Sequence, residues 1–146
     1  MAEWKKICCA IDFSGTSRFA MEKAADLAKR LQGDLALLHV NDAAVGAADE
    51  TGVSMPTLLE EAAREFGPKL EMWQRQAEGL LGRPVRTHVA VGTAVDEILR
   101  FLREGSFDLL VMGTHGRTGL AHFVIGSVAE GVQRRADVPV LVVRHA

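Results

Sequence analysis

The chain has 146 residues, of which 48% are hydrophobic and 25% charged, a balance typical of a folded globular domain rather than of a disordered segment. Lysine and arginine number 17 and aspartate and glutamate 19, and the resulting net charge of −2 argues against nucleic acid as the main partner. No apolar run is long enough for a membrane span or a secretory signal, so we expect one cytoplasmic domain over residues 1–146, without membrane insertion.

The two cysteines, Cys8 and Cys9, are neighbours in the sequence. A disulfide between adjacent residues would be strained, and the chain offers no other cysteine, so we expect two reduced thiols. Metal-ligand spacings such as CxxC and HExxH are absent, which argues against a structural metal site.

The first part of the chain predicts two strands with a helix between them. The apolar runs Ile7–Ile11 and Leu35–Val40 are typical of strands that are covered on both faces. Between them, Ser14–Ser17 supply residues that favour a helix start, and apolar residues follow at helical spacing up to Leu31. Gly33 is expected to end that helix.

A loop and a long helix are predicted next. Residues Asn41–Pro56 are rich in Ala, Gly, Asp and Ser and have no clear period, which predicts a loop. Thr57 and Glu60 form a capping-box pattern, and apolar residues then recur every three or four positions up to Leu80. Gly67-Pro68 lies inside this helix and is expected to kink or break it.

Three further strands complete the pattern, with helices between them. They are expected at Val85–Val91, Phe107–Met112 and Val138–Val143. The first alternates apolar and polar residues, which indicates an edge strand with one wet face, and Pro139 favours a strand start or an edge. Thr93 fits the N-cap of a helix between the first two of these strands. Alternating strands and helices predict an α/β fold, a three-layer open sandwich with a parallel sheet covered on both faces.

The most informative segment is the glycine-rich loop that leaves the fourth strand and leads into a helix. Its pattern is Gly-x2-Gly-x9-Gly-Ser, formed by Gly113, Gly116, Gly126 and Ser127. Glycines allow positive φ angles and a close approach of the backbone to phosphate. A helix that begins at Ser127 adds free N–H donors, and the Ser127 hydroxyl could either cap that helix or donate to a phosphate oxygen. Arg117 in the same loop could pair with phosphate. The alternative is an ordinary turn before a capped helix.

Asp12 follows the first strand directly. In open α/β sheets, ligands bind outside the carboxyl ends of the strands at the point where the strand order reverses. If the first and fourth strands are neighbours, Asp12 and the glycine-rich loop face the same crevice. The carboxylate could then accept from ribose hydroxyls or help to hold a divalent cation, whereas the alternative is a carboxylate satisfied by N–H groups at the helix start.

These features resemble the universal stress protein family over essentially the whole chain. The resemblance implies a five-stranded parallel sheet in the order 3-2-1-4-5, with ATP, or AMP or ADP, as ligand and Mg²⁺ or Mn²⁺ held indirectly through Asp12. It implies a nucleotide site formed by Ala10, Ile11, Asp12, Val40, Met112, Gly113, Gly116, Arg117, Gly126, Ser127 and Val128. It also implies a homodimer joined through the last strand, at Val138, Val140, Leu141, Val142 and Val143.

Together these observations favour an ATP-binding regulatory protein of the stress response, with slow or no hydrolysis and a regulated protein partner that the sequence does not name. Two other functions stay open: an ATP-hydrolysing enzyme, and an interaction protein that needs no nucleotide. The sequence offers no clear general base or lysine for a γ-phosphate, which argues against the enzyme.

Overall fold

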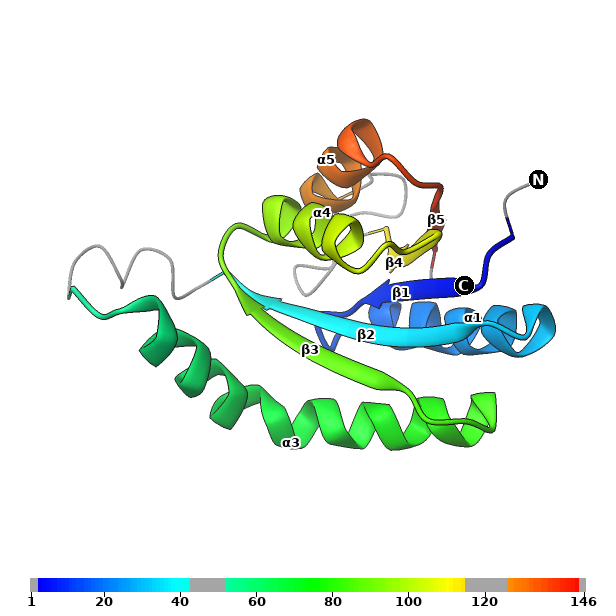
Figure 1. Ribbon diagram of the computed structural model, residues 1–146, viewed down its shortest axis with the longest axis horizontal. Coiled ribbons are helices and arrows are strands. Elements are labelled where there is room, and N and C mark those ends of the chain that lie inside the picture. The colour runs from blue at the N-terminus through cyan, green and yellow to red at the C-terminus, as the bar shows by residue number, and fades with distance from the viewer. Residues whose placement is uncertain (1–2, 43–51, 115–125, 145–146) are drawn as a thin grey trace.

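The computed structural model describes residues 3–42, 52–114 and 126–144, and within them five strands form one parallel sheet. The strands are β1 (Lys6–Ala10), β2 (Asp34–Asn41), β3 (Arg86–Val91), β4 (Leu109–Gly113) and β5 (Val140–Val143). Their order across the sheet is β3-β2-β1-β4-β5, so the expected order is confirmed (Figure 1). The helices of the same residues are α1 (Gly15–Leu31), α3 (Met55–Leu81), α4 (Ala94–Glu104) and α5 (Ser127–Arg135).

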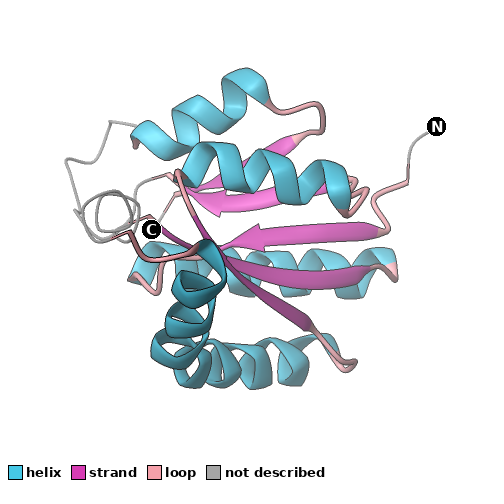
Figure 2. Cartoon of the chain, turned by 60° about the vertical axis from the view of Figure 1, so that its left-hand side comes forward, coloured by secondary structure: helices cyan, strands magenta, loops and turns pink. Residues whose placement is uncertain are grey.

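Helices cover both faces of the sheet, which gives the three layers predicted from the sequence (Figure 2). One core lies between the sheet and α1 with α3, and a second lies between the sheet and α4 with α5. Neighbouring residues of β1 enter different cores: Ile7 and Cys9 pack on the α1 side and Cys8 on the α4 side. All three are fully buried, as the continuous apolar run predicted.

Helix α3 is one continuous helix that passes through Pro68, so of the predicted kink or break, the break does not occur. Its two halves run in different directions in Figure 1, as expected where proline removes a backbone hydrogen bond. The helix starts earlier than the sequence predicted. Its N-cap is Ser54, whose Oγ accepts from the backbone N–H of Thr57 at 3.4 Å, so Thr57 lies inside the first turn.

The end of α1 and the start of β5 also differ from the prediction, the first for a reason of packing and the second for a reason of hydrogen bonding. The left-handed residue at the end of α1 is Gln32, with φ of 55°, and not Gly33. A Cβ on Gly33 would stand 2.9 Å from the carbonyl oxygen of Lys5, so glycine is needed there for space. Strand β5 begins at Val140 and not at Val138, because Pro139 has no N–H to donate to a ladder.

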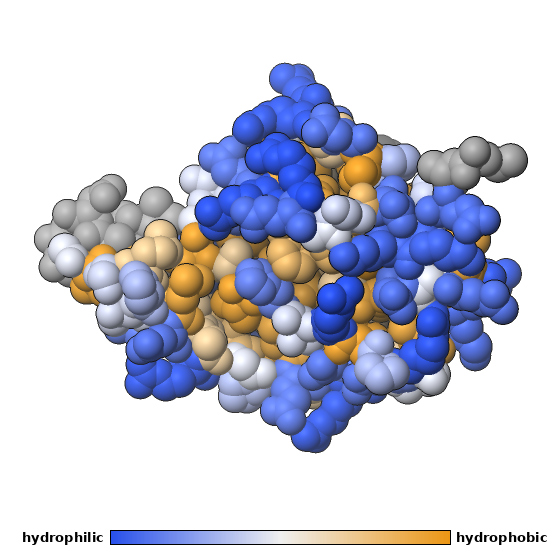
Figure 3. Space-filling model, viewed as in Figure 1, coloured by the Kyte–Doolittle hydropathy of each residue, from blue (hydrophilic) through white to orange (hydrophobic). Residues whose placement is uncertain are grey.

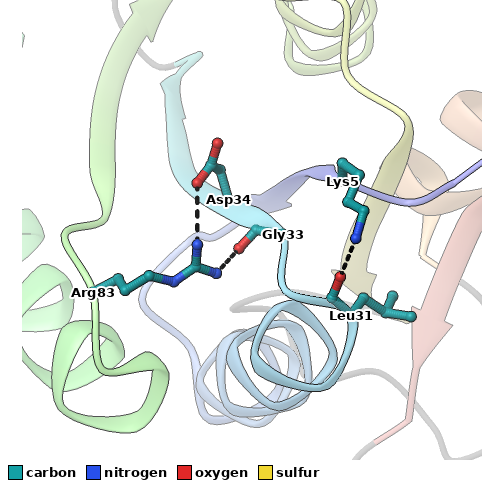
Figure 4. Close-up of polar contacts among 5 residues, drawn as sticks. All are labelled: Lys5, Leu31, Gly33, Asp34 and Arg83. Atoms are coloured by element: carbon teal, nitrogen blue, oxygen red, sulfur yellow. Dashed lines mark hydrogen bonds and ion pairs between the residues drawn. The ribbon is translucent and has the colours of Figure 1, made fainter.

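Basic side chains hold the amino-terminal edge of the sheet (Figure 4). Lys5 Nζ donates to the carbonyl oxygen of Leu31 at 2.8 Å, and Arg83 donates to that of Gly33 and lies 3.6 Å from Asp34. These cations stand at the carboxyl end of α1, where they complement the helix dipole. This edge is therefore occupied by contacts that hold the elements together.

Hydrophilic side chains cover α3 and α4 on the face shown in Figure 3, and hydrophobic side chains gather on the strip between these helices. That strip lies over β3, which is an edge strand as predicted. Arg86 and His88 of β3 are exposed, but Ala90 on the same side is buried, so the predicted wet face extends over only part of the strand. None of the helices described is long and apolar enough to cross a bilayer.

Candidate functional site at the carboxyl edge of the sheet

The strand order reverses between β1 and β4. These two strands are hydrogen-bonded neighbours, with Cys9 opposite Val111. The helix that follows β1 packs on one face of the sheet, and the helix that follows β4 packs on the other. The carboxyl ends of β1 and β4 thus bound the place where open α/β sheets bind ligands, as the position of Asp12 and the glycine-rich loop predicted.

The segment after β1 is held by short-range hydrogen bonds. Asp12 Oδ1 accepts from the backbone N–H of Ser14 at 3.0 Å, and the N–H of Asp12 donates to Ser17 Oγ at 3.3 Å. Ser14 Oγ in turn accepts from the N–H of Ser17 at 3.1 Å and caps α1. A carboxylate can accept several hydrogen bonds, so the bond to Ser14 is compatible with a further role for Asp12.

Phe13 has a backbone conformation that bulky residues rarely adopt, with φ of 65°. Its ring lies among other aromatic rings, 4.6 Å from His39, 6.0 Å from Phe66 and 5.4 Å from Trp73 between centroids. His39 Nδ1 donates to the carbonyl oxygen of Ile11 at 2.9 Å. Aromatic packing and hydrogen bonds therefore fix the chain on both sides of Asp12.

The two ends of the glycine-rich loop meet at the end of β4. The N–H of Gly126 donates to the carbonyl oxygen of Thr114 at 2.5 Å, and the N–H of Thr114 donates to that of Val143 at 3.0 Å. The loop therefore starts and finishes beside the switch point. Gly116 and Arg117 lie outside the described residues.

The Ser127 hydroxyl does not cap the start of α5. Gly126 is the N-cap, and Ser127 is the exposed first residue of the helix. No side chain of the described residues caps this end, whereas Ser14 caps α1. The free backbone N–H groups of this helix start can donate to an anion, and the positive end of the helix dipole favours one here.

Gly113 owes its lack of a side chain to packing. A Cβ at this position would stand 2.6 Å from Thr16 Cγ2, so the end of β4 and the start of α1 approach too closely for one. Gly113 is not among the positive-φ glycines, and φ of Gly126 is −61°. The expectation that these two glycines serve positive-φ turns is therefore wrong.

The other predicted site residues lie at the same edge but differ in exposure. Ile11 and Met112 are buried, 4% and 6% exposed, so only their backbone could meet a ligand. Ala10, Val40 and Val128 are half-buried and pack against the core on the α4 side. Among the described residues, no group of three or more His, Cys, Asp or Glu side chains is arranged to hold a metal ion.

The predicted dimer residues do not all belong to the last strand. Val138 precedes β5 and, like Val140 and Val142, packs against the core under α4 and α5. Val143 is buried in the other core, and Leu141 is 40% exposed at the edge of the sheet. Leu141 is the most exposed of the five.

Sequence reasoning missed Phe13. Glycine or asparagine is the usual signal of a left-handed residue, and phenylalanine is not. The nearest signal was its place between Asp12 and the cap residue Ser14, where a turn must redirect the chain from strand to helix.

Residues 3–144 match the Universal stress protein family. Among curated relatives, universal stress protein MJ0531 of Methanocaldococcus jannaschii is 35% identical over 144 residues, which cover 97% of this chain and 82% of the relative. Universal stress protein YxiE of Bacillus subtilis is 33% identical over 147 residues, which cover 97% of this chain and 99% of the relative.

Solved structures agree with these relatives. Hypothetical protein MJ0577 of M. jannaschii matches with a TM-score of 0.80 and 29% identity, and 99% of each chain is covered. A universal stress protein in complex with cAMP matches with a TM-score of 0.76 and 21% identity over 99% of this chain and 100% of that chain. The universal stress protein from Archaeoglobus fulgidus in complex with dAMP matches with a TM-score of 0.64 and 20% identity over 97% of this chain and 99% of that chain. The last two show a shared fold, and the family match and the curated relatives show that the chain belongs to the universal stress protein family.

Proposed function

We propose that the chain is an ATP-binding regulatory protein of the stress response, whose nucleotide lies at the carboxyl edge of the sheet between β1 and β4. The observation that carries this proposal is the pairing of two features at the switch point: Asp12 at the end of β1, and a helix start after β4 that no described side chain caps. A nucleotide would use both features, whereas an interaction protein that needs no nucleotide would use neither.

The two features suit different parts of a nucleotide. The N–H groups at the start of α5 would donate hydrogen bonds to the phosphate oxygens, and Ser127, exposed in the first turn, would add a hydroxyl donor. Asp12 would accept from the ribose hydroxyls or from water on a phosphate-bound Mg²⁺ or Mn²⁺. Mg²⁺ keeps several waters and needs few protein carboxylates, so a site with one aspartate fits a cation that arrives with the phosphates.

The solved relatives support adenine nucleotides as the ligand class. One universal stress protein was solved with cAMP and another with dAMP. Both ligands carry adenine and a phosphate, which leaves the length of the phosphate chain to experiment. Regulation would follow if a partner protein bound the nucleotide-loaded form better than the empty form.

Thermal unfolding with and without Mg-ATP tests the proposal. A ligand present at 100 times its dissociation constant stabilises a protein by about 2.7 kcal/mol, which raises the melting temperature by several degrees at this chain length. We expect that rise in the wild type, and its loss in Asp12→Asn. The matched control is Asp34→Asn, the same chemical change at the exposed amino-terminal edge, which should keep the rise. No rise in the wild type at millimolar Mg-ATP would contradict the proposal.

Two additions to the same experiment separate the remaining alternatives. AMP and ADP in place of ATP show which phosphate chain the site prefers. Phosphate release, compared between wild type and Asp12→Asn, tests for turnover. Release well above that of the variant would identify an ATP-hydrolysing enzyme.

A further inference from the structure

Phe13 is a bulky residue held in the left-handed region, with φ of 65°, immediately after Asp12. Side chains with a Cβ rarely adopt this conformation, which persists where the surrounding structure enforces it. Asp12 Oδ1 accepts from the N–H of Ser14, two residues on, so this turn also sets the direction of the carboxylate.

The half-buried ring of Phe13 packs against residues on both sides of the bend of α3. Phe66 precedes Gly67-Pro68 and lies parallel to the ring, 6.0 Å away with planes 9° apart. Trp73 follows the bend and meets the ring edge-on, 5.4 Å away with planes 88° apart. Lys69 Nζ lies 5.7 Å from the centre of the same ring. One helix thus contacts the ring from both sides of its proline.

A strand residue also contacts the ring. The His39 ring lies 4.6 Å from Phe13 and 4.4 Å from Phe66, and His39 Nδ1 donates to the carbonyl oxygen of Ile11. The residues on either side of Asp12 are therefore anchored by β2 and α3, elements distant in sequence. Aromatic pairs in these geometries add to the stabilisation from burial alone.

We propose that Phe13 is a positioning residue for nucleotide binding: its ring, held in the bend of α3, keeps the backbone left-handed and so holds the Asp12 carboxylate toward the ligand. This inference rests on the proposed function, because Phe13 would act through Asp12, which is a nucleotide contact in that proposal. It also gives the bend at Pro68 a role, since that bend brings Phe66 and Trp73 around one ring. The competing interpretation is that Phe13 only fills space under α3.

The test compares two variants that each remove one partly buried aromatic ring. Phe13→Gly removes the ring but accepts a positive φ without steric cost, so its effect reports the loss of the anchor. Phe101→Ala removes a ring of α4 on the opposite face, where it contacts His88 and Phe107. Phe13→Leu, which keeps apolar bulk, replaces the glycine variant if that variant does not fold.

Two readouts are needed, both well below the melting temperature. The first is the dissociation constant of Mg-ATP by calorimetry, which should rise about tenfold in Phe13→Gly and stay unchanged in Phe101→Ala. The second is hydrogen exchange of the Ser14 amide in the ligand-free protein. This exchange should be faster in Phe13→Gly, because the amide loses its fixed place against Asp12 Oδ1, and unchanged in Phe101→Ala.

Each readout can overturn the inference. Wild-type affinity in a folded Phe13 variant, or unchanged exchange at Ser14, would leave Phe13 as a space-filling residue. Equal losses of affinity in the Phe13 and Phe101 variants would do the same, since the effect would then be general. Absence of Mg-ATP binding in the wild type would refute the proposed function, whereas the exchange readout would still decide whether Phe13 fixes Asp12.

Discussion

Gly113 belongs to the predicted ligand motif and also has a role in packing. Its missing side chain leaves the space that Thr16 occupies, and a Cβ would lie 2.6 Å from Thr16 Cγ2. We expect Gly113→Ala to destabilise the fold by about 1–3 kcal/mol, the usual cost of overpacking. Urea unfolding measures it. Gly79→Ala is the control: an added Cβ meets nothing within 4 Å in the last turn of α3, so it should stabilise by no more than about 0.5–1 kcal/mol. A neutral Gly113→Ala would show that the contact with Thr16 relaxes freely.

Cys8 and Cys9 lie in β1, the central strand of the sheet. Both thiols are fully buried, and burial raises the pKa of each well above its usual value, with the neighbouring Cys9 raising that of Cys8 further. Only the thiolate reacts readily, so neither should react with Ellman's reagent in the folded protein at pH 8. Both should react after unfolding in guanidinium. Rapid labelling of the native protein would mean that the centre of the sheet opens often.

At the scale of elements, the turn from α3 into β3 depends on the carboxylate of Glu78. Glu78 Oε2 accepts from the N–H of Val85 at 2.9 Å, and Gln74 Nε2 donates to the carbonyl oxygen of the same residue at 2.6 Å. We expect Glu78→Ala to cost about 1–3 kcal/mol in urea unfolding, because it leaves a partly buried N–H without its acceptor. Glu71→Ala, on the same helix, removes an exposed pair with Arg75 and should cost no more than about 0.5 kcal/mol. Equal costs would contradict this assignment.

The elements also show which parts of the fold the sequence can predict. Apolar runs identified the strands because burial on both faces leaves little room for polar residues. The limits of α3 were harder, since Ser54 and Thr57 both suit a cap and only the hydrogen bond between them decides. Pro68 failed to break the helix because the buried stripe continues across it, from Phe66 to Leu70, and packing outweighs the local cost of proline.

The candidate site likewise has parts that the sequence predicts and parts that only contacts in the folded chain decide. Asp12 and the end of β4 could be placed together from the sequence, because strand order and parallel direction bring these ends to one edge. The conformation of Phe13 could not, because contacts with β2 and α3 hold it, and these arise only in the folded chain. The ligand role of Gly113 stays a prediction, and its close contact with Thr16 is a packing reason for glycine that the sequence could not show.

At the scale of the whole molecule, β5 is the last strand on its side of the sheet, and no strand of the described residues pairs with its outer edge. We propose that two copies join through this strand, because a short apolar edge with Leu141 40% exposed suits burial against its own copy. Light scattering coupled to gel filtration should find a dimer in the wild type and a monomer in Leu141→Arg. Leu80→Arg, which adds the same charge at a residue 46% exposed on α3, should remain dimeric. A monomeric wild type at micromolar concentrations would refute the dimer.

The most direct test of the central claim is to locate the nucleotide on the molecule. Amide resonances of the wild type would be followed by NMR while Mg-ATP is added. We expect the largest shifts at residues 10–17, 113–114 and 126–129, and unchanged resonances at the amino-terminal edge around Lys5, Gly33 and Asp108. Absence of shifts at millimolar Mg-ATP, or shifts centred away from the ends of β1 and β4, would contradict a nucleotide site at the switch point.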